Sequence, residues 1–197
     1  EIGRYFIRPP QDFVDMSVDD NRILRLKKKK IIAQRIVAHV TQPFDRIIIM
    51  AFPDLRGYLT FETVTNIVPE EEDVIKPLTL IVNSRFVCWF VYSMIYNKAI
   101  RDMDFDAYFV KRILLPDHKI ITRCLNTLCD YLSFLNTDEH MRQSLAEMIE
   151  FFDRQIVDSL IYELYFGEII HKLEDIVKFF EENSTFFDNL FTVSKIF

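Results

Sequence analysis

Residues 78–116 constrain the fold of this 197-residue chain more than any other stretch. Up to residue 95 the side chains are apolar on nearly every side, and the segment contains no glycine. A segment so long and so uniformly apolar predicts a buried helix rather than a strand. Charged and aromatic residues follow over 97–108, and a short apolar run over 110–115 stops at Pro116. We therefore expect a central helix, a charged loop and a returning strand.

The composition is that of a folded chain. Half of the residues are hydrophobic, 14% are aromatic and only three are glycine, which excludes a disordered chain and favours much helix. The length suffices for one good core or two small ones. The apolar run 86–95 is too short for a membrane span, which needs about 20 residues. We therefore expect it to be a core helix of a cytoplasmic protein.

Residue types that carry catalysis or bind metals are few. The three cysteines, Cys88, Cys124 and Cys129, lie in apolar surroundings without a C-x-x-C spacing, so we expect buried free thiols in a reducing compartment. The four histidines form no H-x-x-x-H pair, and the isolated glycines provide no phosphate-binding loop. An enzyme confined to these residues is not expected.

The charge is distributed unevenly along the chain. Residues 1–116 contain 17 Lys and Arg against 15 Asp and Glu, whereas residues 117–197 contain 7 against 15. Within residues 22–56, nine basic residues face only Asp45 and Asp54. The basic charge is therefore concentrated where a polyanion can use it. The acidic second half argues against a nucleic acid wrapped around the whole molecule.

The chain changes its apolar period at Pro116. Before it, β-branched residues predict a strand over 31–40, carrying Gln34 and Arg35, and another over 46–52. A turn signal over 53–57 precedes a partly alternating segment over 58–68. After Pro116, a period of 3.6 predicts helices over 120–135, 141–164 and 169–180, packed antiparallel because their connections are short. Residues 136–138 offer a break with N-cap residues, and Gly167 a second break.

Five short motifs occur in order: Lys30 to Arg35, Thr65 to Val68, Val82-Asn83-Ser84, Ile113 to Pro116, and Ile156 to Tyr165. In this order they resemble the C-terminal target-recognition (specificity) domain of TaqI-like adenine-N6 DNA methyltransferases, including type IIG restriction-modification enzymes. The last motif, similar to the family's Ile-Asp-x-Leu-Val-Tyr-Glu-Leu-Tyr signature, is the most specific. The family's closing strand carries two prolines, and only Pro116 is present here.

The resemblance implies an α+β fold, with a mixed α/β target-recognition domain over 1–116 followed by an antiparallel helical domain over 117–197. It implies sequence-specific recognition of double-stranded DNA for an adenine-N6 methyltransferase or a fused restriction-modification enzyme. Catalysis, with S-adenosylmethionine as cofactor, would belong to an N-terminal methyltransferase or endonuclease domain of the same protein. The tetrapeptide Arg8-Pro9-Pro10-Gln11 lacks the Asn or Asp and the aromatic residue of the family's catalytic motif. We expect no catalytic residue, cofactor or metal in this chain.

Basic and aromatic residues are the candidates for DNA contacts, because Arg and Lys bind both phosphates and base edges. The candidate DNA-binding residues are Lys27, Lys28, Lys29, Lys30, Arg35, Arg46, Arg56, Tyr58, Lys98, Arg101, Lys111 and Arg112. The alternative for these charges is a solvated surface without a ligand. For the chain as a whole, the alternative is a helical protein-interaction or dimerisation module that does not bind DNA. Tyr162 and Tyr165, among apolar neighbours, are expected in the core.

Overall fold

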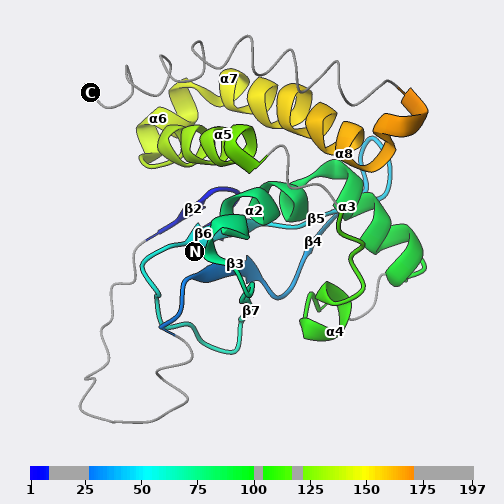
Figure 1. Cartoon of the computed structure of the whole chain (residues 1–197), viewed down its shortest axis with the longest axis horizontal. Helices are drawn as coiled ribbons and strands as arrows, with labels where there is room; N and C mark the ends of the chain where they lie inside the picture. The colour runs from blue at the N-terminus through cyan, green and yellow to red at the C-terminus, as the bar shows by residue number, and fades with distance from the viewer. Residues whose placement is uncertain (9–26, 100–103, 117–121, 171–197) are drawn as a thin grey trace. The chain divides into compact units, whose positions relative to one another are not determined.

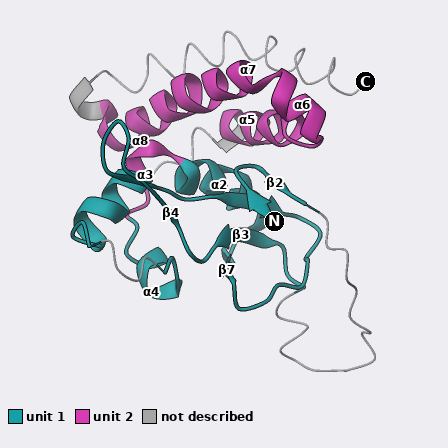
Figure 2. Ribbon diagram, turned by 180° about the vertical axis from the view of Figure 1, so that it is seen from behind, with its two compact units in different colours: residues 1–83, 87–113 teal, residues 84–86, 114–197 magenta. Residues whose placement is uncertain are grey.

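The computed structural model describes residues 1–8, 27–99, 104–116 and 122–170 (Figure 1). They contain helices and antiparallel sheets, so the predicted α+β fold is confirmed. The chain divides into two compact units, coloured separately in Figure 2. Unit 1 comprises Glu1–Asn83 and Val87–Ile113, and unit 2 comprises Ser84–Phe86 and the chain from Leu114 onward. Independent folding of residues 1–116 and 117–197 stays a prediction.

Unit 1 is built on a three-stranded antiparallel sheet in the order β6-β3-β7. The strands are β3 (Lys30–Gln34), β6 (Ala51–Asp54) and β7 (Val64–Ile67). The register places Lys30 opposite Asp54, and Ile32 opposite Asn66. The apolar residues of β3 are fully buried, which explains why β-branched side chains suit this central strand.

Two further strand pairs belong to unit 1. They are β1 (Ile2–Gly3) with β2 (Phe6–Ile7), and β4 (Ala38–Val40) with β5 (Arg46–Ile48). The strand predicted over 31–40 is therefore two strands, β3 and β4, and the one predicted over 46–52 is β5 and β6. The segment from residue 58 becomes a strand only at Val64, because the residues before it form a loop tied to the sheet by side chains.

Helix α2 (Ile75–Asn83) follows the 3-10 turn η1 (Glu72–Val74) and packs against β6 and β3. Pro77 lies in its first turn, where a missing N–H costs no helical hydrogen bond. At the end of α2, the buried Asn83 donates from Nδ2 to the carbonyl oxygen of Ala51 at 3.0 Å. Its Oδ1 accepts from the N–H of Ala51 at 2.9 Å, so both groups of one peptide position in β6 are satisfied by this side chain.

The predicted central helix is broken at Ser84. It continues as α3 (Arg85–Phe90) and the π-helical η2 (Val91–Ile95), and the parts before and after Ser84 are bent by 58°. The N–H of Arg85 donates to the Asp158 carboxylate at 2.9 Å, so α3 begins with a cap from outside the helix. Among the described residues, only this bent pair has the length and composition of a membrane span, and no single helix does.

The strand predicted over 110–115 is wrong: Val110 is the last residue of a short helix, α4 (Ala107–Val110), and residues 111–116 form a turn followed by irregular chain. Asp106 caps α4 by accepting from the N–H groups of Tyr108 and Phe109, and a capped turn competes well with an extended strand. The preceding Phe105 is fully buried, and its N–H donates to the carbonyl oxygen of Arg35 at 2.6 Å. This contact attaches the start of α4 to the end of β3.

The described part of unit 2 is helical. Its elements from Leu114 onward are α5 (Thr122–Leu135), α6 (Glu139–Ser144), α7 (Ala146–Phe151), the π-helical η3 (Phe152–Val157) and α8 (Asp158–Ile170). Asp138 caps α6 as predicted, accepting from the N–H groups of His140 and Met141. The helix break predicted at Gly167 is not found, because Gly167 lies within α8. The helix predicted over 169–180 lies, beyond Ile170, outside the described residues.

Helices α5 and α7 lie side by side and run in opposite directions (Figure 1), as their short connection predicts. The rings of Tyr131 and Phe152 lie 4.9 Å apart, and the Tyr131 hydroxyl donates to Sδ of Met148 at 3.9 Å. Burial raises the pKa of Tyr131. Leu128 and Leu132 of α5 are buried as well, so the predicted apolar stripe forms the core of this unit.

Candidate nucleic-acid interface

Lys30 and Asp54 form a buried ion pair across β3 and β6. Both side chains are 0% exposed, and Nζ lies 3.4 Å from Oδ2. The ammonium also donates to the carbonyl oxygen of Tyr58 at 2.5 Å. Burial lowers the pKa of Lys30, and the attraction of Asp54 offsets part of that effect. Lys30 therefore does not reach a phosphate, and the structure corrects its place among the candidate DNA contacts.

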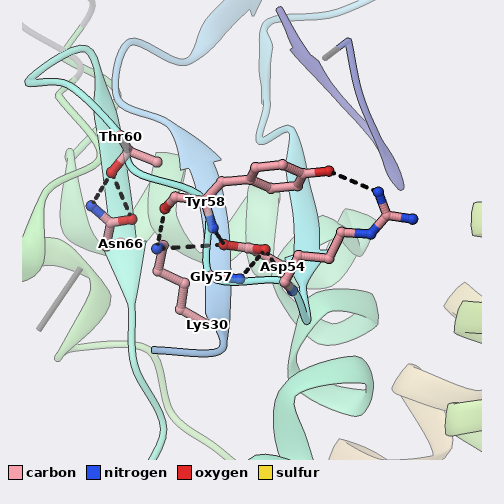
Figure 3. Close-up of polar contacts among 7 residues, drawn as sticks. Lys30, Asp54, Gly57, Tyr58, Thr60 and Asn66 are labelled. Atoms are coloured by element: carbon pink, nitrogen blue, oxygen red, sulfur yellow. Dashed lines mark hydrogen bonds and ion pairs between the residues drawn. The ribbon is translucent and has the colours of Figure 1, made fainter. Parts of the chain in front are cut away.

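Asp54 organises the turn that follows β6. Its Oδ1 accepts from the N–H groups of Arg56 and Gly57 at 3.0 and 2.9 Å, and its Oδ2 accepts from the N–H of Tyr58 at 2.7 Å. Figure 3 shows the bonds to Gly57 and Tyr58 meeting at the carboxylate beside Lys30. A buried carboxylate needs several donors, and here the donors are consecutive backbone groups. The pair therefore fixes the backbone of this turn.

Gly57 allows the backbone of Lys27 to lie against the turn that follows β6. Its φ of +74° lies in the left-handed region that favours glycine. A Cβ at this position would lie 2.0 Å from the carbonyl oxygen of Lys27, so no other residue permits the observed approach. The run of lysines and the turn after β6, far apart in sequence, are thus in backbone contact.

We name the exposed cations around this contact the basic edge: Lys27, Lys28, Lys29 and Arg56. Lys29 pairs with Glu72 at 2.6 Å, with both side chains about half exposed, and such a pair contributes at most about 1 kcal/mol. No described residue forms an ion pair with Lys27 or Lys28. The basic edge thus contains four exposed cations, one of them paired with Glu72 of the acidic run 70–73, and Arg56 donates to the Tyr58 hydroxyl at 3.3 Å. The basic edge therefore presents charge that a phosphate can neutralise.

The loop of residues 55–63, the pinned loop below, is held at its far end as well. Nδ2 of Asn66 donates to the Thr60 hydroxyl at 2.7 Å, and that hydroxyl lies 3.0 Å from Oδ1 of Asn66 (Figure 3). The guanidinium and the N–H of Arg35 donate to the carbonyl oxygens of Glu62 and Thr63, each at 3.2 Å. The candidate Arg35 thus serves the backbone of the loop.

Arg35 also connects the pinned loop to the segment before α4. Its guanidinium lies 3.1 Å from the Asp104 carboxylate. On α4 and just after it, Lys111 and Arg112 are exposed, and the Arg112 guanidinium lies 3.8 Å above the Tyr108 ring and donates to its hydroxyl. Glu62, Asp104 and Asp106 balance the three cations of this group. It therefore offers hydrogen bonds and stacking rather than net charge.

Three candidates lie outside both groups. Arg46 donates to the carbonyl oxygens of Gln42 and Phe44 within its own hairpin. Lys98 is exposed in the turn after η2, at a φ of +59°. Arg101 lies outside the described residues. The structure thus gathers Lys27, Lys28, Lys29, Arg56 and Tyr58 at one place, and Arg35, Lys111 and Arg112 at another.

In unit 2, the segment Ile156 to Tyr165 contacts Arg85 and Phe86, which directly follow Ser84, and also Leu114. The carboxylate of Asp158 caps Arg85, directly after Asn83-Ser84, and lies 3.5 Å from the Arg85 guanidinium. The ring of Phe86 contacts the rings of Tyr162, Tyr165 and Phe166 at 4.3–6.1 Å. The Tyr165 hydroxyl donates to the carbonyl oxygen of Leu114 at 2.5 Å, and burial raises its pKa to about 12. Tyr165 is half-buried and Tyr162 is 40% exposed, so neither is the core residue that the sequence predicts.

Asp54, Gly57 and Asn66 were not candidates on sequence grounds. The signal available was the Asp-x-x-Gly turn after a strand, which predicts a carboxylate that bonds the following N–H groups. Among the described residues, no group of three or more His, Cys, Asp or Glu has the arrangement of a metal site. Comparisons with models of protein families, with curated proteins and with solved structures find no match to this chain.

Proposed function

We propose that this chain binds double-stranded DNA and serves as the target-recognition part of an adenine-N6 methyltransferase or a fused restriction-modification enzyme. The observation that carries the proposal is the basic edge, whose exposed cations surround a turn fixed by the buried pair of Lys30 and Asp54. Phosphate contacts of Lys and Arg supply affinity and register. A rigid support keeps those contacts in place without further loss of conformational entropy.

The distance between the two groups suits a duplex. In the sequence, β3 (Lys30–Gln34) separates Lys29 of the basic edge from Arg35, and its five residues correspond to about 17 Å at the usual rise of a strand. A duplex rises about 3.4 Å per base pair, so the two groups span about five base pairs. The basic edge would bind the backbone, while Tyr108, Lys111 and Arg112 supply the polar and stacking groups that base edges require.

The net charge of −6 does not oppose this assignment. Screening at physiological salt acts over about 8 Å, so the field at the basic edge is set by the residues beside it, Glu72 included, and not by the net charge of the chain. The hydrogen bond from Tyr165 to Leu114 supports the family assignment, since it joins two of the segments that resemble the family. Methyl transfer, with S-adenosylmethionine, would be the task of a catalytic domain outside this chain.

Salt-dependent binding of a pool of random duplexes to the full chain tests the proposal. Lys28→Ala should weaken binding to all duplexes and reduce the slope of log affinity against log salt by about 0.9, because one released counterion is lost. Lys98→Ala removes the same charge from an exposed site outside both groups and should leave the slope unchanged. If no duplex is retained at the lowest salt, the assignment is wrong, and the protein-interaction alternative is then measured by sedimentation.

A further inference from the structure

The pinned loop combines a fixed backbone with an exposed aromatic side chain. Phe61 is 76% exposed and Leu59 is 37% exposed, although both lie between the anchors at Tyr58 and Glu62. The N–H of Val64 also donates to the carbonyl oxygen of Phe61 at 3.1 Å, which closes a turn at the tip. Phe61 is thus presented to the outside by backbone that is held on both sides.

The residues around Phe61 indicate what kind of partner fits. The same loop carries Arg56 and touches Lys27, so a polyanion held by the basic edge passes close to it. The exposed carboxylate of Glu62 beside the tip repels a phosphate, so bases rather than backbone are the matching surface here. Aromatic side chains stack on bases or enter between base steps whatever the sequence, because every base has a flat face.

We propose that Phe61 packs against the bases of the duplex held by the basic edge, at the tip of the pinned loop. This inference rests on the proposed function. It gives the loop a contribution to binding that does not come from charge. Phe61 neutralises no phosphate, so its contact with DNA releases no counterion. Substitution of Phe61 should therefore change affinity without changing salt dependence, whereas substitution of Lys28 should change both.

The first test compares Phe61→Ala with Phe44→Ala in the full chain, using random duplexes. Phe44 is 64% exposed on the hairpin between β4 and β5, away from both groups. We expect Phe61→Ala to weaken binding about tenfold, within the usual range for loss of one base–aromatic stack, with an unchanged salt slope. Phe44→Ala should bind as the parent does. Because both side chains are exposed, neither variant should alter the thermal unfolding midpoint.

The second test reads the contact directly. The chain contains one tryptophan, Trp89, so a chain with Trp89→Phe and Phe61→Trp reports from the loop alone. Stacking on bases should quench its emission as duplex is added, and the same chain carrying Phe44→Trp instead of Phe61→Trp should not respond. Duplex binding that depends on Lys28 but neither weakens with Phe61→Ala nor quenches the loop tryptophan overturns this inference and leaves the proposed function intact.

Two other outcomes also decide the question. If no chain retains duplex at low salt, the proposed function fails and this inference fails with it. If Phe61→Ala instead abolishes self-association seen by sedimentation while duplex binding is unaffected, the tip contacts protein, and the assignment to bases is overturned.

Discussion

At Lys30 and Asp54 the chain keeps two opposite charges out of water within one small sheet. The mutual attraction of such a pair commonly falls short of the cost of removing both ions from water. Here each ion has further partners, the Tyr58 carbonyl oxygen for the ammonium and three backbone N–H groups for the carboxylate. The pair is therefore better understood as fixing the conformation of the turn than as a source of net stability.

Substitution of Lys30 by Met tests that interpretation. It leaves the Asp54 carboxylate buried without a counter-ion, and we expect the free energy of unfolding to fall by about 3–5 kcal/mol. Lys28→Met, at an exposed position of the same run, should change it by no more than about 0.5 kcal/mol. Urea unfolding of both variants provides the measurement. Equal effects at the two positions would contradict the burial of Lys30.

The same pair predicts a pH dependence with a definite sign. The pKa of Lys30 is lowered in the folded chain, whereas in the unfolded chain it stays near 10.5. Between those two values the unfolded chain binds the extra proton, so this group makes stability rise with pH. The difference in unfolding free energy between the parent and Lys30→Met should therefore increase towards pH 10.5. A difference that is flat or decreases over that range would show that the pKa is not lowered.

The sequence does not reveal which of four consecutive lysines is buried. Alternation with Ile32 indicates that Lys30 shares its face of β3, but only the pairing with Asp54 makes burial tolerable. That pairing depends on the register between β3 and β6, two strands that are separated in sequence. The local sequence pattern does not determine this register. For the same reason the contact of Gly57 with Lys27 was not predictable from the sequence, whereas the candidates Lys27, Lys28 and Arg56 are exposed in the structure.

At the scale of elements, two aspartates begin helices in different ways. Asp138 caps its own helix from the preceding residue, a local arrangement that the Asn-Thr-Asp sequence predicts. Asp158 caps α3 from a position 73 residues later in the chain, so no local pattern shows it. Asp106 is likewise a local cap, and the helix that it begins ends at Val110, the first residue of the strand wrongly predicted over 110–115.

Replacing each aspartate by Ala should separate the two kinds of cap. Asp138→Ala removes an exposed cap and should cost about 0.5–2 kcal/mol. Asp158→Ala also leaves Arg154 and the start of α3 without the buried carboxylate, and should cost about 3–5 kcal/mol. Urea unfolding compares them. A smaller loss for Asp158 than for Asp138 would mean that α3 begins without help from α8.

At the scale of the whole molecule, each of the two units is made of two separate stretches of the chain. Unit 2 contains the three residues Ser84–Phe86, which lie between two segments of unit 1. Composition and period predicted a sheet-bearing first part and a helical second part, because these follow from local pattern. The inclusion of Ser84–Phe86 in the helical unit follows from the contacts of Phe86 with Tyr162, Tyr165 and Phe166, which local pattern does not contain.

A fragment of residues 1–113 should therefore be incomplete. It retains Phe86, only 8% exposed in the full chain, but loses the aromatic rings around it. Exposure of one such side chain costs about 1.5–3 kcal/mol, and the fragment should bind a hydrophobic dye and unfold at lower urea than the full chain. Phe86→Ser within the fragment should reduce the dye signal. A fragment that binds no dye and matches the full chain in its unfolding midpoint would contradict this expectation.

The bonds between Asn83 and Ala51 have a consequence for how copies of this chain behave in a crowded solution. Strand β6 lies at the border of its sheet, where unpaired peptide groups invite another polypeptide to add a strand and begin aggregation. Here the Asn83 amide occupies both groups of Ala51, and Pro53 has no N–H to offer a newcomer. The helix that covers the sheet thus helps to close its border, together with the N–H of Tyr5, which also donates to the Ala51 carbonyl oxygen at 3.0 Å, so the strand that holds Asp54 is a poor template for misassembly.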